Sequence, residues 1–275
     1  MRAPSSTAKG PERLTRWLVT LPPTLFLVVF FLVPALIMAA ASFREPGEFG
    51  GLAPLAGHPP TLEAYRFVAD PIYFRILAKS FAVAGLTTLL CLLLAYPLAL
   101  LIARSPKGRR NVLVLLVILP FASNLLIRVY AWIIILGPLN LLYSPEAVIA
   151  GMVYVHLPFM ILPLYTNLEK HDPALLEAAQ DLGADAWTRF RRVTLPLSLP
   201  GILSGSALVF IPVLGMFAIP ELLGGTGDIL IGNLIKEQFL DNRDWPLGAT
   251  LSILLTVAVL GVAAVSAAFT RKAAP

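Results

Sequence analysis

The chain has 275 residues, of which 57% are hydrophobic and 13% charged, with a mean hydropathy of +0.80. Soluble domains carry about 25% charged residues. The low charge content of this chain therefore excludes a soluble domain and indicates an integral membrane protein. The net charge of +5 does not indicate nucleic-acid binding, because basic loops on the cytoplasmic side of a membrane protein account for it. The single cysteine, Cys91, excludes an intrachain disulfide and has no metal-ligand neighbours, so we expect a packing residue.

Six apolar stretches reach the roughly 20 residues that a helix needs to cross a hydrocarbon core of about 30 Å. None shows the alternation over about ten residues that is typical of a barrel strand. The first is longer than a signal-peptide core of about 7–15 residues, and we interpret it as an uncleaved helix. The sequence therefore predicts an all-α polytopic membrane protein with six transmembrane helices. In chain order they are Leu18–Ala41, Ser80–Ala103, Val112–Gly137, Ala147–Leu168, Gly201–Pro220 and Leu247–Phe269.

The basic residues predict the orientation of the chain. Fourteen of the 21 lysines and arginines fall in the two termini and in the second and fourth loops, and six fall in the remaining loops. The positive-inside rule then places both termini in the cytoplasm. We expect a cytoplasmic tail over residues 1–17, a transmembrane domain over 18–269 with a large cytoplasmic loop at 169–200, and a second tail over 270–275.

The most polar segment, residues 172–196, lies in that loop and has the pattern of a helical hairpin. Asp172-Pro173 is an N-cap carboxylate followed by proline at the first helical position. Gly183 stands where a left-handed turn ends a helix, and Asp185 can cap a second helix. We expect Leu195-Pro196 to end that helix, because the residue before a proline resists the helical region. The hairpin is too short to fold alone, so its apolar faces need the chain's own helix ends, the membrane surface or another protein.

The hairpin resembles the loop of ABC-importer permeases that has the pattern E-A-A-x3-G-x9-I-x-L-P, with Val193 in place of isoleucine. The resemblance implies an importer-permease (MetI-like) core, in which this hairpin is the coupling helix that docks in a groove of a separate ATPase subunit. We find no G-x4-G-K-[ST] phosphate loop, so this chain should not bind ATP. We expect no enzyme activity, cofactor or metal on it. ATP and magnesium would belong to partner chains. The implied ATPase-coupling residues are Glu177, Ala178, Ala179, Gly183, Leu195 and Pro196.

Three further segments resemble the spermidine/putrescine importer permeases: LPFASNLLIRVYAWIIILG (119–137), GMFAIPELLGG (215–225) and NRDWPLGATLS (242–252). This resemblance implies polyamine import across the bacterial cytoplasmic (inner) membrane by alternating access. The implied partners are a second homologous permease, two ATPase subunits and an extracytoplasmic solute-binding protein. The alternatives are an importer permease for iron, thiamine or phosphonate, or a self-sufficient secondary carrier. A carrier typically shows repeats between its halves, and we see none.

A path for polyamines needs carboxylates and aromatic faces, because cation–π attraction adds about 0.5–2 kcal/mol per good contact. The outer loop 221–247 holds five acids and two bases and is net negative by three. Within it, the spacing of apolar residues predicts a helix over 229–240. The alternative interpretation is that the acids are solvated charges or salt-bridge partners of a docking protein, and that the aromatic residues belong to an interfacial belt. The path candidates are Tyr130, Trp132, Glu221, Asp241, Asp244 and Trp245.

Two basic residues, Arg128 and His156, lie inside predicted spans. A mid-membrane arginine costs about 2.5–3.5 kcal/mol on insertion scales, and a cation repels a polyamine, so we expect a structural or gating role for Arg128. It would pair with Glu221 or with an acid of the partner permease. His156 is either a pH-sensitive gate or, more commonly, a hydrogen-bonded packing residue. Gly201 and Gly205 give a small-residue face that allows a close helix contact. A subunit interface is one location for such a contact.

Overall fold

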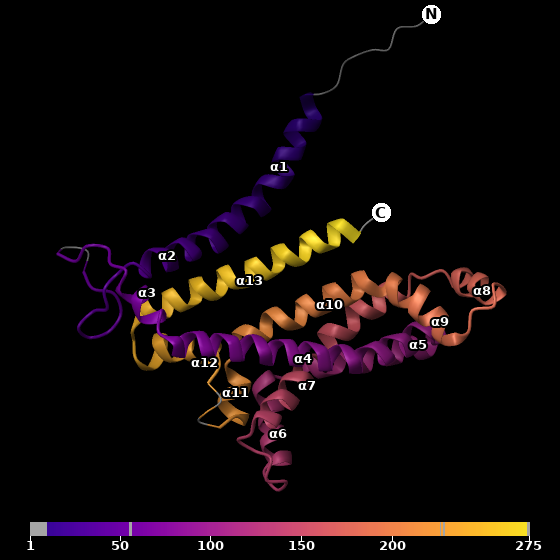
Figure 1. The fold of residues 1–275 in the computed structure, drawn as a ribbon. Coiled ribbons are helices and arrows are strands. Elements are labelled where there is room, and N and C mark those ends of the chain that lie inside the picture. Colours follow the sequence, from indigo (N-terminus) through magenta and orange to yellow (C-terminus); the bar gives the residue numbers. More distant parts are fainter. Residues whose placement is uncertain (1–9, 55–56, 226, 228, 274–275) are drawn as a thin grey trace, which may run out of the picture. The chain divides into compact units, whose positions relative to one another are not determined.

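The computed structural model describes residues 10–54, 57–225, 227 and 229–273 (Figure 1). Among them are five helices long and apolar enough to cross a membrane, and a bent helix pair that makes a sixth if it is one span. These helices confirm the predicted all-α membrane fold. The five are Val19–Ala41, Pro71–Arg104, Pro145–Leu168, Ala186–Gly215 and Trp245–Ala264.

The chain forms two compact units, one from Met1–Val68 and Gln238–Val257, the other from Ala69–Glu237 and Ala258–Pro275. In the first unit, the N-terminal helix runs as α1 (Gly10–Leu27), a π-helical turn and α2 (Val33–Ala41). Only 6% of its most apolar window is buried within the chain.

Polar and aromatic contacts organise the rest of the first unit. The hydroxyls of Ser42, after the end of α2, and Tyr65, in α3 (Glu63–Val68), are hydrogen-bonded at 2.9 Å. The Tyr65 ring also stacks on Phe43 with 5.2 Å between centroids. In α13 (Trp245–Ala273), the Thr250 hydroxyl donates to the Pro246 carbonyl at 2.9 Å and lies 3.4 Å from the Ser42 carbonyl. These contacts join the end of α2 to α3 and to the start of α13.

The core of the second unit is a set of three membrane helices that pack on one another: α4 (Pro71–Arg104), α7 (Pro145–Leu168) and α10 (Leu195–Gly215). Along α4 the buried side chains are mostly small, which lets helix backbones approach closely where lipid offers no hydrophobic driving force. Cys91 is one of them, and its sulfur lies 3.7 Å from the Val153 carbonyl of α7, as expected of a packing residue. The buried positions of α4 are Ser80, Ala84, Thr87, Cys91, Ala95, Ala99 and Ile102.

The glycines of α10 serve this core rather than a subunit interface. A Cβ atom on Gly201 would lie 2.8 Å from the Cβ of Asn167, and one on Gly205 would lie 2.8 Å from the sulfur of Met160. Both neighbours belong to α7. The small-residue face therefore forms a close helix contact inside the chain.

The predicted span Val112–Gly137 is sharply bent. The structure has α5 (Lys107–Ile118), a 3-10 turn (Leu119–Ala122) and α6 (Leu125–Leu136), with a bend of 93° between the two arms. Pro120 lies in the turn and lacks an N–H group for a continuing helix, and Asn124 begins α6 by accepting a hydrogen bond from the Leu126 amide at 2.8 Å. A proline followed by a new N-cap thus breaks an uninterrupted apolar run.

Other predicted bounds also change. The second span begins at Pro71 because Asp70 caps it, accepting from the Ile72 amide at 2.9 Å. The predicted span Gly201–Pro220 ends at Gly215, and Pro220 lies in the separate helix α11 (Ala218–Leu223). The helix predicted over 229–240 is α12 (Ile231–Lys236) with a π-helical turn over Glu237–Asp241.

Substitution of Gly232 tests the packing of α12. A Cβ there would lie 2.7 Å from the carbonyl oxygen of Gly215, a backbone atom that cannot rotate away. We expect Gly232→Ala to destabilise the fold by about 1–3 kcal/mol. Gly85→Ala is the matched control, because nothing lies within 4 Å of its Cβ position and alanine favours a helix over glycine by about 0.5–1 kcal/mol. Thermal unfolding of the purified protein in detergent measures both; equal melting temperatures for the two variants would contradict this packing.

Candidate functional site

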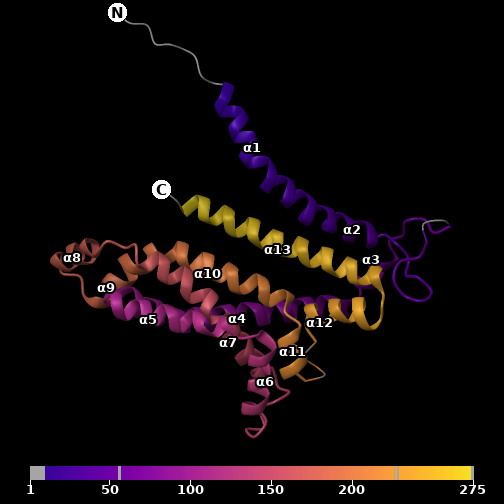
Figure 2. The same cartoon turned by 180° about the vertical axis from the view of Figure 1, so that it is seen from behind.

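The segment 172–196 folds as the predicted helix, glycine turn and helix. Its first arm is α8 (Pro173–Asp181), capped by Asp172, whose carboxylate accepts from the Ala174 amide at 3.0 Å. Gly183 has φ +81°, the left-handed conformation that glycine adopts without strain. The second arm begins with α9 (Ala186–Arg189), capped by Asp185. Figures 1 and 2 show α8 and α9 at the same end of the second unit as the start of α5.

The second arm does not end at Leu195-Pro196. After α9 the chain makes a π-helical turn over Phe190–Thr194 and continues as α10, so that Ala186–Gly215 is one helix of 30 residues. The Leu195 amide donates to the Phe190 carbonyl, the wider spacing of a π turn. Pro196 lies at the start of α10, where its missing N–H is tolerated. The hairpin is therefore a direct extension of a membrane helix.

The turn of the hairpin presents apolar side chains that the chain itself leaves uncovered. Leu182 is 89% exposed and Trp187 is 65% exposed. Glu177 and Ala178 are exposed, and Ala179 is half-buried. Two exposed large apolar groups beside a charged helix are typical of a surface that another component covers.

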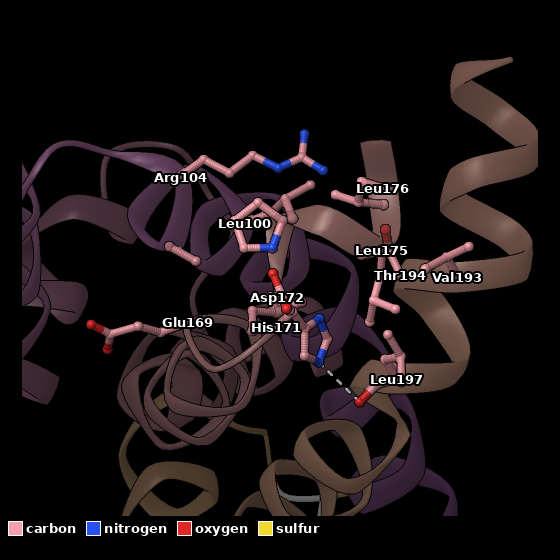
Figure 3. A pocket seen from close by; sticks show the side chains of 13 residues that line it. Leu100, Arg104, Glu169, His171, Asp172, Leu175, Leu176, Val193, Thr194 and Leu197 are labelled. Carbon is pink, nitrogen blue, oxygen red and sulfur yellow. Dashed lines mark hydrogen bonds between the residues drawn. The ribbon is translucent and has the colours of Figure 1, made fainter. Parts of the chain in front are cut away.

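The first arm lies over a cavity of about 400 Å³ (Figure 3). Its walls come from the ends of α4 and α7, from Leu175 and Leu176 of α8 and from the π turn. His171 donates through Nε2 to the Leu197 carbonyl at 3.1 Å, and Glu169 forms an ion pair with Arg110 at 2.7 Å. The base of α8 is thus fixed by polar contacts, whereas its apolar face borders open space.

Charge is arranged unevenly over the hairpin. Arg189 joins the two arms by donating from Nη1 to the Gln180 side-chain oxygen at 2.6 Å. Arg191 and Arg192 are exposed. Hydrogen bonds from the side chain and the backbone amide of Thr188 hold the pKa of Asp185 below its usual value. The second arm therefore carries a cap that is ionised at neutral pH, beside exposed cations.

A second candidate site lies near α11 and α12, away from the hairpin. Near α12, Ser80 accepts from the Ile231 amide at 2.8 Å, whereas Arg104 lines the hairpin cavity. Both residues belong to α4, and at 1.5 Å per residue about 36 Å of helix separates them. A cavity of about 810 Å³ opens there. The carboxylate of Glu221 in its wall pairs with Lys236 at 3.1 Å. The lining residues are Tyr143, Pro220, Glu221, Gly224, Gly225, Ile229 and Asn233.

Of the six path candidates, Glu221 is the one that lines this cavity. Glu221 lines the cavity near α11, whereas Tyr130 and Trp132 lie on α6, where Tyr130 is 54% exposed and Trp132 packs edge-on against Tyr154 with 5.6 Å between centroids. The other three candidates belong to the first unit, and Asp228, a further acid of that loop, lies outside the described residues.

In that first unit, Asp244 acts as a helix cap, accepting from the Leu247 amide at 3.0 Å. Asp241 and Trp245 are exposed. Sequence reasoning missed Tyr143 and Asn233. The only local signal was that Asn233 stands three residues before Lys236, on the same side of a helix.

The Glu221 carboxylate, one of the two partners expected for Arg128, pairs with Lys236. The Nε and Nη1 atoms of Arg128 are buried and have no hydrogen-bond partner among the described residues. His156 is 2% exposed and donates from Nδ1 to the Met152 carbonyl at 2.8 Å, which fits the packing interpretation. Within the part of the chain that the structure describes, no three His, Cys, Asp or Glu side chains gather as a metal site requires.

Comparisons with known sequences define the family of the chain. Residues 95–273 match the family described as binding-protein-dependent transport system inner membrane component. The chain is 41% identical over 256 residues to the spermidine/putrescine transport system permease protein PotB of Escherichia coli K12, covering 86% of this chain and 90% of that protein. It is 42% identical over 251 residues to PotB of Haemophilus influenzae, covering 84% and 86%.

Solved structures share the fold at lower identity. A bacterial ABC transporter involved in the import of the acidic polysaccharide alginate contains a chain with a TM-score of 0.70 and 18% identity, covering 96% of this chain and 97% of that one. The MetNI methionine ABC transporter contains one with a TM-score of 0.62 and 17% identity, covering 75% and 100%. These likenesses concern the arrangement of the helices alone.

The Asp185 cap predicts a pH dependence of the second arm. Because the folded-state pKa is below the ordinary 3.8, the stabilisation is present above that value and is lost as the pH falls through the lowered pKa. We expect Asp185→Ala to lose severalfold protection of the Thr188 amide in hydrogen exchange at neutral pH. Asp185→Asn, which still caps, should keep that protection and lose its acid dependence. Equal protection in the alanine variant and the unaltered protein would contradict the role of the cap.

Proposed function

The chain belongs to the family of binding-protein-dependent transport system inner membrane components, and from this we propose that it is the membrane-spanning permease subunit of an ATP-driven polyamine importer. Its apolar helices and its family make it a multi-pass inner membrane protein. The observation that carries the substrate assignment is the 41–42% identity to PotB over most of both chains.

Energy would enter this subunit through the hairpin. Glu177, Ala178, the half-buried Ala179 and Gly183 form the docking surface for an ATPase subunit, with Leu182 at its tip. The continuous helix Ala186–Gly215 acts as a lever. Leu195 and Pro196 then lie inside this lever and do not mark its end. A displacement of the docked turn is transmitted along one continuous helix into the core that α10 shares with α4 and α7. The open cavity behind Leu175 and Leu176 gives α8 room to follow.

The partners in this proposal are a second homologous permease, two ATPase subunits that hold ATP and magnesium, and an extracytoplasmic solute-binding protein. The uncovered apolar tip of the hairpin supports the ATPase contact. The family description itself refers to binding-protein-dependent transport. Both termini and the hairpin would lie in the cytoplasm, in accordance with the positive-inside rule.

The substrate path would run past the cavity near α11, where Glu221 offers a carboxylate to a cation. Tyr130, Trp132, Asp241, Asp244 and Trp245 stay candidates for the path at other points. Arg128 has a structural or gating role in this proposal. Its unpartnered buried donors call for a carboxylate, which the second permease would supply.

ATPase measurements on the complete reconstituted complex test this function. We expect the ATPase rate to rise severalfold when the binding protein carries putrescine or spermidine, and to stay at the basal rate with empty binding protein. Glu177→Lys should assemble with its partners yet lose this stimulation, because it reverses the charge at the docking surface. Stimulation by an iron complex, thiamine or a phosphonate instead of a polyamine would refute the substrate. Full stimulation of the Glu177→Lys complex would refute the coupling role of the hairpin.

A further inference from the structure

One ion pair near the α11 cavity is made of the same chemical groups as the proposed substrate and its receptor. The Lys236 Nζ lies 3.1 Å from Glu221 Oε1, and the two side chains are 24% and 44% exposed. Lys236 carries a primary alkylammonium group, which is also the group at each end of putrescine and spermidine. Glu221 lines the cavity. Lys236 does not line it, but reaches the Glu221 carboxylate from the last turn of α12.

The cavity wall offers a second acceptor that lacks a donor. Asn233 donates from Nδ2 to the Phe217 carbonyl at 3.0 Å, which turns its amide into one orientation. Its Oδ1 is buried and has no hydrogen-bond partner among the described residues. A buried acceptor without a donor is destabilising, and an ammonium group has three N–H donors to give. The wall that holds the Glu221 carboxylate thus also contains a buried oxygen that lacks a donor.

The third group is aromatic. Tyr143 lines the same cavity, is 66% exposed and is held in the left-handed conformation with φ +63°. Its backbone amide donates to the Leu223 carbonyl at 2.9 Å, which fixes the residue beside the end of α11. An exposed tyrosine ring attracts alkylammonium groups through its face. Together these groups make a site suited to an alkylammonium ion.

We propose that Lys236 occupies, on Glu221, the place of a substrate ammonium group, and that an arriving polyamine end displaces it. This inference rests on the proposed function, because it takes the substrate to be a polyamine. A solvent-accessible ammonium–carboxylate pair is weak, so one ammonium can replace another without a large barrier. In the resting protein, Lys236 neutralises Glu221. When substrate arrives, Glu221 accepts from the polyamine, and Lys236 turns away to solvent.

Exchange and a merely structural salt bridge predict different results for the two partners. If the pair only stabilises the fold, neutralising either side chain impairs transport similarly. If exchange occurs, Glu221→Gln removes the acceptor and Lys236→Met removes the competitor. In proteoliposomes with the complete complex and a subsaturating amount of putrescine-loaded binding protein, we expect Glu221→Gln to lower uptake about tenfold. Lys236→Met should equal or exceed the unaltered complex.

The exchanged pair Glu221→Lys with Lys236→Glu sharpens the test. It keeps an ion pair between α11 and α12 but puts the cation in the cavity wall, where it repels substrate. We expect it to transport no better than Glu221→Gln, although it should copurify with its partners. Glu146→Gln, an exposed acid in the first turn of α7 outside the cavity, is the control for net charge and should leave uptake unchanged.

Each outcome decides the proposal. Uptake restored by the exchanged pair, a loss in Lys236→Met comparable to that in Glu221→Gln, or unchanged uptake in Glu221→Gln would overturn the exchange while polyamine transport stands. Should Glu221→Gln fail to assemble, Lys236→Met and the exchanged pair still decide. If the unaltered complex transports no polyamine, the proposed function fails, and this inference fails with it.

Discussion

The continuous helix from Ala186 to Gly215 is the constraint on which the rest of this structure depends. A proline in the middle of a helix normally removes a hydrogen bond and introduces a kink. Here the π turn over Phe190–Thr194 precedes Pro196, so the missing N–H falls at the junction of two helical segments. Because the helix continues, the polar hairpin and the membrane core are mechanically one piece. A flexible loop between them would absorb a displacement instead of transmitting it.

That lever is useful only if its inner end meets a rigid core. Small side chains along α4 and the glycines of α10 bring both helices close to α7, and close-packed interiors transmit strain rather than dissipating it. The outer end has the opposite character. Leu182 and Trp187 are exposed, and the apolar face of α8 borders a cavity. The unit is thus well packed within the membrane helices and incomplete at its tip, as expected of one subunit of a larger machine.

Local rules predicted the hairpin well because its signals act over a few residues. Asp172, Gly183 and Asp185 all take the cap and turn positions that their residue types favour. The end of the second arm was predicted wrongly, because the rule for residues before proline does not anticipate a π turn. Hydropathy likewise found the apolar run 112–137 but cannot show a change of direction. Pro120 in the turn and Asn124 at the N-cap of α6 indicate the change of direction, but the prediction did not use them.

Contacts between distant segments were beyond the reach of sequence patterns. The Glu221–Lys236 pair depends on how α11 and α12 pack, so the sequence offered Arg128 as an equally good partner. The glycines of α10 were recognised as a close-contact face, but their neighbour could not be identified from the sequence. The predicted set of residues around Glu221 was incomplete for the same reason. Tyr143 and Asn233 line the same cavity as Glu221 because the fold brings them there.

Cysteine cross-linking at the tip of the hairpin tests the central claim most directly. The only native cysteine is the buried Cys91, which can be replaced by alanine to give a clean background. In the complete complex, a short bismaleimide should link Leu182→Cys to an ATPase subunit and should leave Leu240→Cys, also an exposed leucine, unlinked to it. A tip cysteine that reacts with free maleimide but forms no adduct with the ATPase, or an equal adduct at position 240, would contradict the account.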